Sequence, residues 1–230
     1  MDIKIPYTPR KHQAHLHRQI DKHRWNVLVC HRRFGKTVCM INHLIRSALL
    51  SKLNNPRFAY IAPTFKQAKS IAWDYMKQFT AKIPHTKFNE TELRVDLPNG
   101  SRITLLGSES PDGLRGIYLD GCVIDEYANV NSKLFPEIIR PALSDRKGYC
   151  VFIGTPMGMN NNFYELYQHA QGAEDWFNYK AKASDTKIVD NDELVKAKEV
   201  MGDKKYQQEF SLLYTSPSPR DLSTSRMPST

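Results

Sequence analysis

The chain has 230 residues, of which 40% are hydrophobic and 25% charged, and its formal net charge is +9. This length suits one α/β domain, and the composition is that of a globular protein rather than a disordered or fibrous one. No apolar run approaches the roughly 18 residues of a membrane-spanning helix, and the N-terminus lacks a signal-peptide core. The basic excess permits a polyanionic partner such as nucleic acid; a solvated basic face is the alternative.

The polar N-terminal segment predicts a short helix over residues 12–20, which contains Gln13. A glutamine upstream of a phosphate loop can hydrogen-bond the edge of an adenine, because its amide both donates and accepts. A solvated helical glutamine is the alternative. The histidines of this region have no carboxylate or cysteine at ligand spacing, so they do not predict a metal site.

A phosphate-binding loop is indicated next. The apolar run Val27–Val29 leads into a loop that ends in Gly35, Lys36 and Thr37, and a helix is predicted from there to about residue 53. In a P-loop the backbone N–H groups and the helix dipole hold phosphates, the lysine reaches the β- and γ-phosphates, and the threonine hydroxyl binds Mg²⁺. Cys30 stands where the usual pattern has its first glycine, so a surface turn before a helix is the alternative.

The rest of the chain alternates between strands and helices. Strands are predicted at residues 57–62, 93–97, 101–106, 121–126, 149–153 and 176–181, and helices at 64–81, 131–143, 160–170, 191–200 and 204–213. The turn at 98–100 makes residues 93–106 a hairpin. Short, wholly apolar strands between helices predict a mainly parallel sheet with helices on both faces.

The predicted strand at 121–126 ends in an acidic pair, Asp125 and Glu126, directly after its apolar residues. This is the pattern of a Walker B motif, in which Asp125 would bind Mg²⁺ and Glu126 would activate the attacking water. The alternative is a strand that runs into a polar turn. The upstream Gly-Lys-Thr favours the motif, and the second carboxylate favours an ATPase over a kinase.

Two further residues are candidates for the same site. Thr155 follows the strand at 149–153, where a hydroxyl can sense the γ-phosphate and relay its loss. Arg115 lies in a glycine-bounded loop at 107–116 and is a candidate arginine finger. The alternatives are an ordinary strand-to-loop turn and a solvated loop arginine.

With these motifs the chain resembles the ATPase domain of tailed-bacteriophage terminase large subunits over about residues 5–210. The resemblance implies a P-loop NTPase fold of the RecA/ASCE type. It implies an adenine motif at Pro9–Gln13, catalytic roles for Arg32, Lys36, Arg115, Glu126 and Thr155, and metal binding by Thr37 and Asp125. The implied ATP-binding residues are Gln13, Cys30, His31, Arg32, Arg33, Phe34, Gly35, Lys36 and Thr37. Arg32 and Arg33 are adjacent, so their roles can be exchanged.

The same resemblance implies a function and its partners. The domain would hydrolyse ATP with Mg²⁺ and drive double-stranded DNA into a procapsid. It would work in the host cytoplasm as a homo-oligomeric ring at the portal protein, with the terminase small subunit as a further partner and without a membrane. Arg115 would act on the neighbouring subunit.

The C-terminal segment 211–230 is rich in serine, threonine and proline and predicts a disordered tail. It resembles translated sequencing-adapter read-through; a natural disordered linker is the alternative. The nuclease domain of the family would be absent after residue 210, so we expect no nuclease activity from this chain.

Two rival functions stay open from the sequence. A superfamily-2-type helicase or translocase also carries Asp-Glu at its Walker B motif, but it needs a second RecA-like domain. A basic DNA-binding module with a vestigial P-loop needs no hydrolysis at all.

Overall fold

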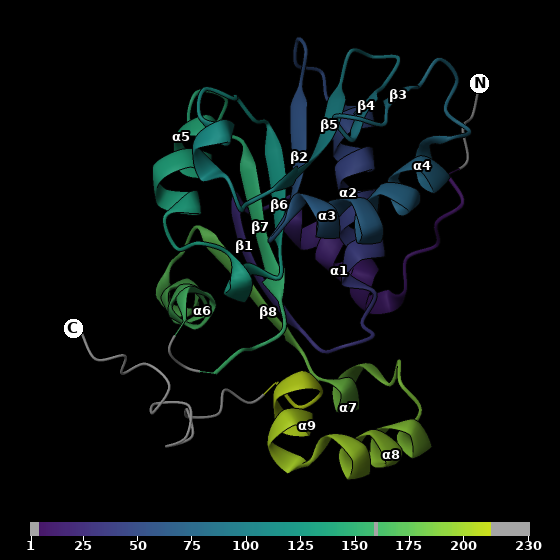
Figure 1. Ribbon diagram of the computed structural model, residues 1–230, viewed down its shortest axis with the longest axis vertical. Helices are drawn as coiled ribbons and strands as arrows, with labels where there is room; N and C mark the ends of the chain where they lie inside the picture. Colours follow the sequence, from purple (N-terminus) through teal and green to yellow (C-terminus); the bar gives the residue numbers. More distant parts are fainter. Residues whose placement is uncertain (1–4, 159–160, 213–230) are drawn as a thin grey trace, which may run out of the picture.

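The computed structural model describes residues 5–158 and 161–212, and these form one mixed sheet between two layers of helices (Figure 1). The strands are β1 (Trp25–Cys30), β2 (Arg57–Ala62), β3 (Lys87–Asn89), β4 (Arg94–Asp96), β5 (Arg102–Gly107), β6 (Gly121–Asp125), β7 (Tyr149–Gly154) and β8 (Trp176–Ala181). Their order is β3-β4-β5-β2-β6-β7-β1-β8. The neighbours from β5 to β8 are parallel, and the β3-β4-β5 end is antiparallel.

The helical segments follow in chain order. They are α1 (Lys11–Ile20), α2 (Lys36–Leu50), α3 (Phe65–Gln67), η1 (Ala68–Trp73), α4 (Asp74–Thr80), η2 (Pro111–Leu114), η3 (Tyr127–Asn129), η4 (Phe135–Ile139), α5 (Arg140–Ala142), α6 (Asn162–Gly172), α7 (Ala183–Thr186), α8 (Asn191–Met201) and α9 (Asp203–Glu209). Of these, η1 and η4 are π-helical and η2 and η3 are 3₁₀-helical.

Alternating side chains of the strands supply two separate cores. In β1, Leu28 and Cys30 pack with α1, α2 and α4, whereas Val27 and Val29 pack with η4 and α6. Both sets are fully buried, which is the pattern of a parallel strand covered on both faces. The predicted α/β fold, mainly parallel and covered on both sides, is therefore confirmed.

The carboxyl ends of the parallel strands meet at one edge of the sheet. In Figure 1 the segments α7, α8 and α9 lie beyond this edge, below the ends of the strands. Loops and helix N-termini that follow the strands gather there, because each βα connection leaves the sheet on the same side. The predicted P-loop, acidic pair and Thr155 all belong to this edge.

Several predicted boundaries are wrong. Helix α2 ends at Leu50 rather than residue 53, because Ser51 adopts an extended conformation. The helix predicted at 64–81 is interrupted by the π-helical turn η1, and Thr64 caps its start by accepting the Gln67 N–H. The predicted helix 131–143 is reduced to η4 and α5, which carry Pro136 and Pro141 in their first turns. Helix α9 ends at Glu209 rather than residue 213.

The packing of the described residues extends past residue 210, where the predicted motor domain ends. Leu212 is fully buried in the core that contains Trp25 and Phe163. The ordered packing therefore includes a residue assigned to the predicted tail. The rest of that tail, residues 213–230, and the start of the helix predicted at 160–170 lie outside the described residues.

Cys30, Cys39, Cys122 and Cys150 are buried free thiols. Within the described ranges no helix is long and apolar enough to cross a bilayer.

Candidate nucleotide-binding site

The phosphate loop joins the end of β1 to the start of α2. Two of its residues, Arg33 and Gly35, have positive φ angles of 71° and 85°. Gly35 lies directly before Lys36, and a Cβ atom there would come within 3.0 Å of the Gln13 amide nitrogen. A glycine is thus required both by the left-handed backbone and by the close approach of α1. The glycine missing at Cys30 falls on the last residue of β1, where no such conformation is needed.

Gln13 holds the end of this loop. Its amide nitrogen donates to the Gly35 carbonyl over 3.4 Å, and its amide oxygen accepts the Arg10 N–H over 3.0 Å. The Arg10 guanidinium donates to the Phe34 carbonyl over 3.4 Å. Gln13 is 4% exposed. The predicted adenine residue is therefore in place beside the loop, with its amide engaged by the loop itself.

The loop is also tied to the segment beyond the sheet edge. The Arg32 N–H donates to the Glu209 carbonyl over 2.9 Å, and the His31 N–H donates to the Ala181 carbonyl over 3.0 Å. The His31 ring nitrogen Nε2 lies 2.7 Å from the Thr186 hydroxyl. Burial lowers the pKa of His31, which favours the neutral ring that these contacts use. The loop and the α7–α9 segment form one hydrogen-bonded unit.

Lys36 and Glu126 face each other across the site. Lys36 Nζ lies 3.7 Å from Glu126 Oε1, and the side chains are 12% and 38% exposed. Burial raises the pKa of Glu126, Lys36 counteracts this, and the Asp125 carboxylate adds to the rise. Glu126 has a φ of 47°, in the left-handed region, so the chain turns directly after β6. A carboxyl group with a raised pKa beside a lysine suits a general base.

Asp125 is held on both of its oxygens. Oδ1 accepts the Glu126 N–H over 2.9 Å, and Oδ2 accepts the hydroxyl of Tyr60. The Thr37 side chain lies close enough to the same hydroxyl to lower the pKa of Tyr60. Burial, with the Asp125 charge next, raises the pKa of Tyr60 well above its ordinary range, so the phenol is protonated. The two predicted metal ligands, Asp125 and Thr37, therefore meet at one phenol oxygen of β2.

The oxygen donors fit the ion implied for this site. Hydroxyl and carboxylate oxygens are the ligands that Mg²⁺ takes, together with the phosphates of a substrate. Thr37 and Asp125 would hold such an ion, and Glu126 stands beside them. When bound, Mg²⁺ would neutralise charge on the β- and γ-phosphates.

A cavity of about 850 Å³ opens over these residues. Its walls include Arg32, Lys36, Glu126 and Thr155 of the predicted set. The opposite wall comes from the end of α8 and from α9. The residues of that wall are Met201, Gly202, Asp203, Lys204, Lys205, Gln208 and Glu209. The volume suits a ligand of nucleotide size.

Other predicted residues lie away from this cavity. Cys30, His31 and Phe34 are fully buried, so only their backbone is available to a phosphate. Arg115 follows η2, is exposed, and is not among the residues of the cavity wall. The structure thus brings together the lysine, the acidic pair and Thr155, but not Arg115.

Three contributors were missed by the sequence analysis. Tyr60 lies in an apolar strand, where the single phenol hydroxyl was the available signal. Lys204 and Lys205 belong to an amphipathic helix whose polar face predicts only solvent contact. Their approach to the cavity depends on the long-range turn of the chain after β8.

The fold and the site together define a P-loop nucleotide-binding protein. Residues 29–210 match the family model described as "Terminase large subunit, T4likevirus-type, N-terminal". The chain therefore belongs to this family of terminase large subunits. It is 30% identical over 126 residues to the terminase large subunits of Thermus phage G20c and Thermus virus P23-45. The match covers 46% of this chain and 26% of each relative, so the chain spans only a part of these longer proteins.

Solved structures show the same fold. The large terminase ATPase domain of Thermus phage P74-26 superposes with a TM-score of 0.76 at 22% identity, over 92% of this chain and 96% of that one. A large terminase from a thermophilic bacteriophage, solved in complex with ADP, has a TM-score of 0.77 at 16% identity. That match covers 89% of this chain and 53% of the other.

Proposed function

We propose that this chain is the ATP-hydrolysing motor domain of a bacteriophage terminase large subunit, which drives double-stranded DNA into a procapsid. The observation that carries the proposal is the Lys36–Glu126 ion pair. Its two charged atoms lie 3.7 Å apart, and both residues line a cavity of nucleotide size. A DNA-binding module with a vestigial P-loop has no reason to keep the lysine, Glu126 and Thr155 around one cavity, with Asp125 buried directly before Glu126. The family membership supports the same function, and the ADP-bound relative supports the ligand.

The steps follow from the contacts of the site. Lys36 and Glu126 neutralise each other in the described conformation. On nucleotide binding Lys36 turns to the β- and γ-phosphates, which are the stronger partner, and Glu126 is released to accept a proton from the attacking water. Thr37 and Asp125 would hold Mg²⁺, and Arg32 would add positive charge from the loop. Thr155, at the end of β7, reports the loss of the γ-phosphate.

The arginine finger comes from a second subunit in this proposal. Arg115 is exposed and lies outside the cavity of its own chain. In a homo-oligomeric ring it reaches the neighbour's site and stabilises charge on the transferring phosphate, a contribution of about 10³–10⁵ in rate. An isolated subunit then hydrolyses ATP slowly.

Duplex DNA is the proposed cargo, with portal protein and terminase small subunit as partners in the host cytoplasm. The net charge of +9 supports phosphate contacts without base readout. Residues 1–210, extended to Leu212 by its buried side chain, form the motor domain of this proposal. We keep the prediction that the chain has no nuclease activity, which Mg²⁺- or Mn²⁺-dependent DNA cleavage by the purified chain would overturn.

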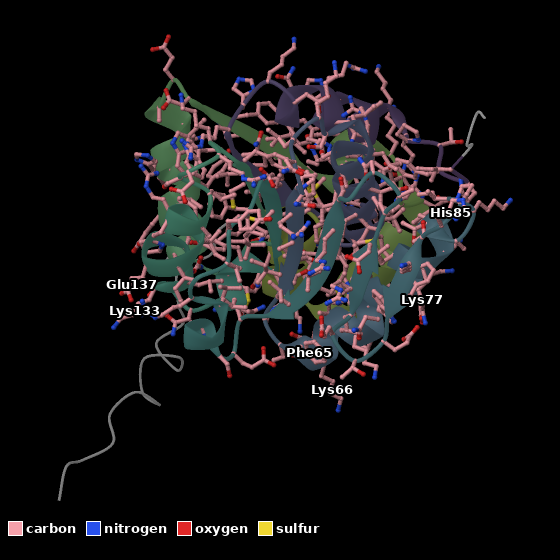
Figure 2. All side chains as sticks on the ribbon, turned by 90° about the horizontal axis from the view of Figure 1, so that it is seen from above. Phe65, Lys66, Lys77, His85, Lys133 and Glu137 are labelled. Atoms are coloured by element: carbon pink, nitrogen blue, oxygen red, sulfur yellow. The ribbon has the colours of Figure 1, made fainter. Side chains whose placement is uncertain are left out.

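Steady-state ATP hydrolysis by the wild type and by Lys36→Ala and Glu126→Gln variants tests the proposal. Hydrolysis lost in both variants and retained in the control Lys66→Ala supports it, since Lys66 projects from the surface away from the cavity (Figure 2). Hydrolysis unchanged in Glu126→Gln overturns the assignment of the base. A wild type without any hydrolysis, even with duplex DNA present, favours the DNA-binding module.

A further inference from the structure

Tyr60 is a buried polar residue that the mechanism above does not use. It lies in the middle of β2, between β5 and β6, and is 1% exposed. Its ring packs in the core that includes Met40 and Leu105, which would accept a phenylalanine equally well. The hydroxyl is the polar atom that needs an explanation, because a buried hydroxyl is kept only with a partner.

The partners of that hydroxyl are the two residues predicted to bind the metal. Tyr60 donates to Asp125 Oδ2, and the Thr37 side chain lies close enough to the same hydroxyl to lower its pKa. Asp125 comes from β6 and Thr37 from the first turn of α2. The Tyr60 phenol therefore lies between side chains of two different elements. With Oδ1 fixed by the Glu126 N–H, the carboxylate is fixed in rotation as well as in position.

We propose that Tyr60 is a positioning residue for the metal site, which holds the Asp125 carboxylate and the Thr37 hydroxyl at the spacing that Mg²⁺ requires. Mg²⁺ demands near-ideal octahedral geometry, so ligands that are fixed in advance bind it more tightly than free ones. Tyr60 need not touch the ion or the nucleotide. This inference rests on the proposed function, since it concerns the metal of the same site.

The test compares a Tyr60→Phe variant with the wild type in the binding of a fluorescent ADP analogue, with and without Mg²⁺. We expect the affinity without Mg²⁺ to change less than about twofold, because no nucleotide contact is removed. The Mg²⁺ concentration that gives half of the affinity gain should rise about tenfold, the usual effect of losing one hydrogen bond to a buried charge. At saturating Mg²⁺, kcat should stay within about threefold of the wild type.

Tyr149→Phe is the matched control. Tyr149 also contacts α2 through its hydroxyl, which lies 3.1 Å from Ser47 Oγ, but it touches neither metal ligand. A structural effect of losing a buried phenol hydroxyl appears in both variants, whereas a positioning effect appears in Tyr60→Phe alone. Para-aminophenylalanine at position 60 has an amino group that can donate again. Its incorporation should return the Mg²⁺ concentration for half of the affinity gain to the wild-type value.

The outcomes separate the positioning role of Tyr60 from the proposed motor function. A folded Tyr60→Phe variant with an unchanged Mg²⁺ requirement overturns the role of Tyr60 and leaves the motor function intact. A wild type whose nucleotide affinity does not respond to Mg²⁺ overturns the proposed function itself. If Tyr60→Phe does not unfold cooperatively, para-fluorophenylalanine fills the hydroxyl's volume without donating, and the same tenfold increase is expected from it.

Discussion

At the scale of single residues, the site is organised by a few contacts that keep reactive groups occupied. Lys36 neutralises Glu126, and Tyr60 satisfies Asp125. In the proposed mechanism, an arriving nucleotide takes Lys36 from Glu126. This exchange would release the base only when the phosphates are bound, and would limit water activation to the loaded site.

The raised pKa of Glu126 predicts the acid limb of the pH–rate profile. The base works as a carboxylate, so kcat/KM should fall as the pH falls through this pKa. Since burial raises the pKa, the limb should lie above the value near 4.3 of an ordinary glutamate. Steady-state ATP hydrolysis over a pH series measures it. A limb at or below 4.3, or the same limb in the residual activity of Glu126→Gln, would assign it to another group.

At the scale of elements, the phosphate loop is hydrogen-bonded to the α7–α9 segment. The two share the Arg32–Glu209 backbone bond and the contact between His31 and Thr186, and the His31 N–H also bonds Ala181 at the end of β8. These bonds join the loop that faces the phosphates to the helix that carries Lys204 and Lys205 into the cavity wall. The phosphate loop therefore helps to position the wall of the cavity that comes from α8 and α9.

Replacing Thr186 with valine should weaken this connection. The variant keeps the side-chain volume but leaves the His31 ring without its partner at 2.7 Å, at a cost of about 1 kcal/mol. We expect nucleotide affinity to fall about threefold to tenfold, measured by titration with a fluorescent ADP analogue. Ser184→Ala is the control, because its hydroxyl contacts only the exposed Asp185. Equal affinities in both variants would show that the loop does not depend on α7.

The elements also show what could be predicted from the sequence. Strands β1, β2, β6 and β7 are apolar runs bounded by polar turns, and burial on both faces is what produces such runs. Strand β3 was missed because three residues at a sheet edge, two exposed and one half-buried, carry no pattern. The π-turn η1 was missed because its sequence is that of an ordinary helix.

In the site, too, residues of local motifs could be predicted from the sequence, and residues brought in by long-range contacts could not. Lys36, Thr37, Asp125 and Glu126 are local motifs, and adjacent parallel strands bring them to one edge. Tyr60 reaches them through a hydroxyl from a different strand, which sequence spacing does not encode. The meeting of Lys36 and Glu126 at one cavity depends on the strand order, which places β1 two strands from β6.

At the scale of the whole molecule, two buried histidines join α1 to α2. His17 Nδ1 lies 3.1 Å from His43 Nδ1, with the rings stacked, and Asp21 and Arg46 lie beside them. Burial lowers the pKa of His17 to about 4 and that of His43 to about 3. Both groups are neutral in the folded chain at pH 7.

This pair predicts a loss of stability in mild acid. Below the unfolded value near 6.5 the unfolded chain binds protons that the folded chain does not, so stability falls as the pH falls from 6.5 toward 4. Urea unfolding at pH 7.5 and 5.5 should show a loss of about 1 kcal/mol per histidine. A His43→Gln variant should show a smaller loss. A His85→Gln control, on the surface in Figure 2, should lose as much stability as the wild type between the two pH values. An equal loss in the wild type, His43→Gln and His85→Gln would contradict a role for the buried pair.

The central claim is that Glu126 and Lys36 form one hydrolytic site with separate tasks. Single-turnover hydrolysis of ATP by Glu126→Gln, together with the equilibrium affinity of the same variant for nucleotide, tests it most directly. We predict an affinity within about threefold of the wild type and a rate of hydrolysis about 10²–10⁴ lower. An undiminished rate in a variant that binds nucleotide normally would contradict the claim.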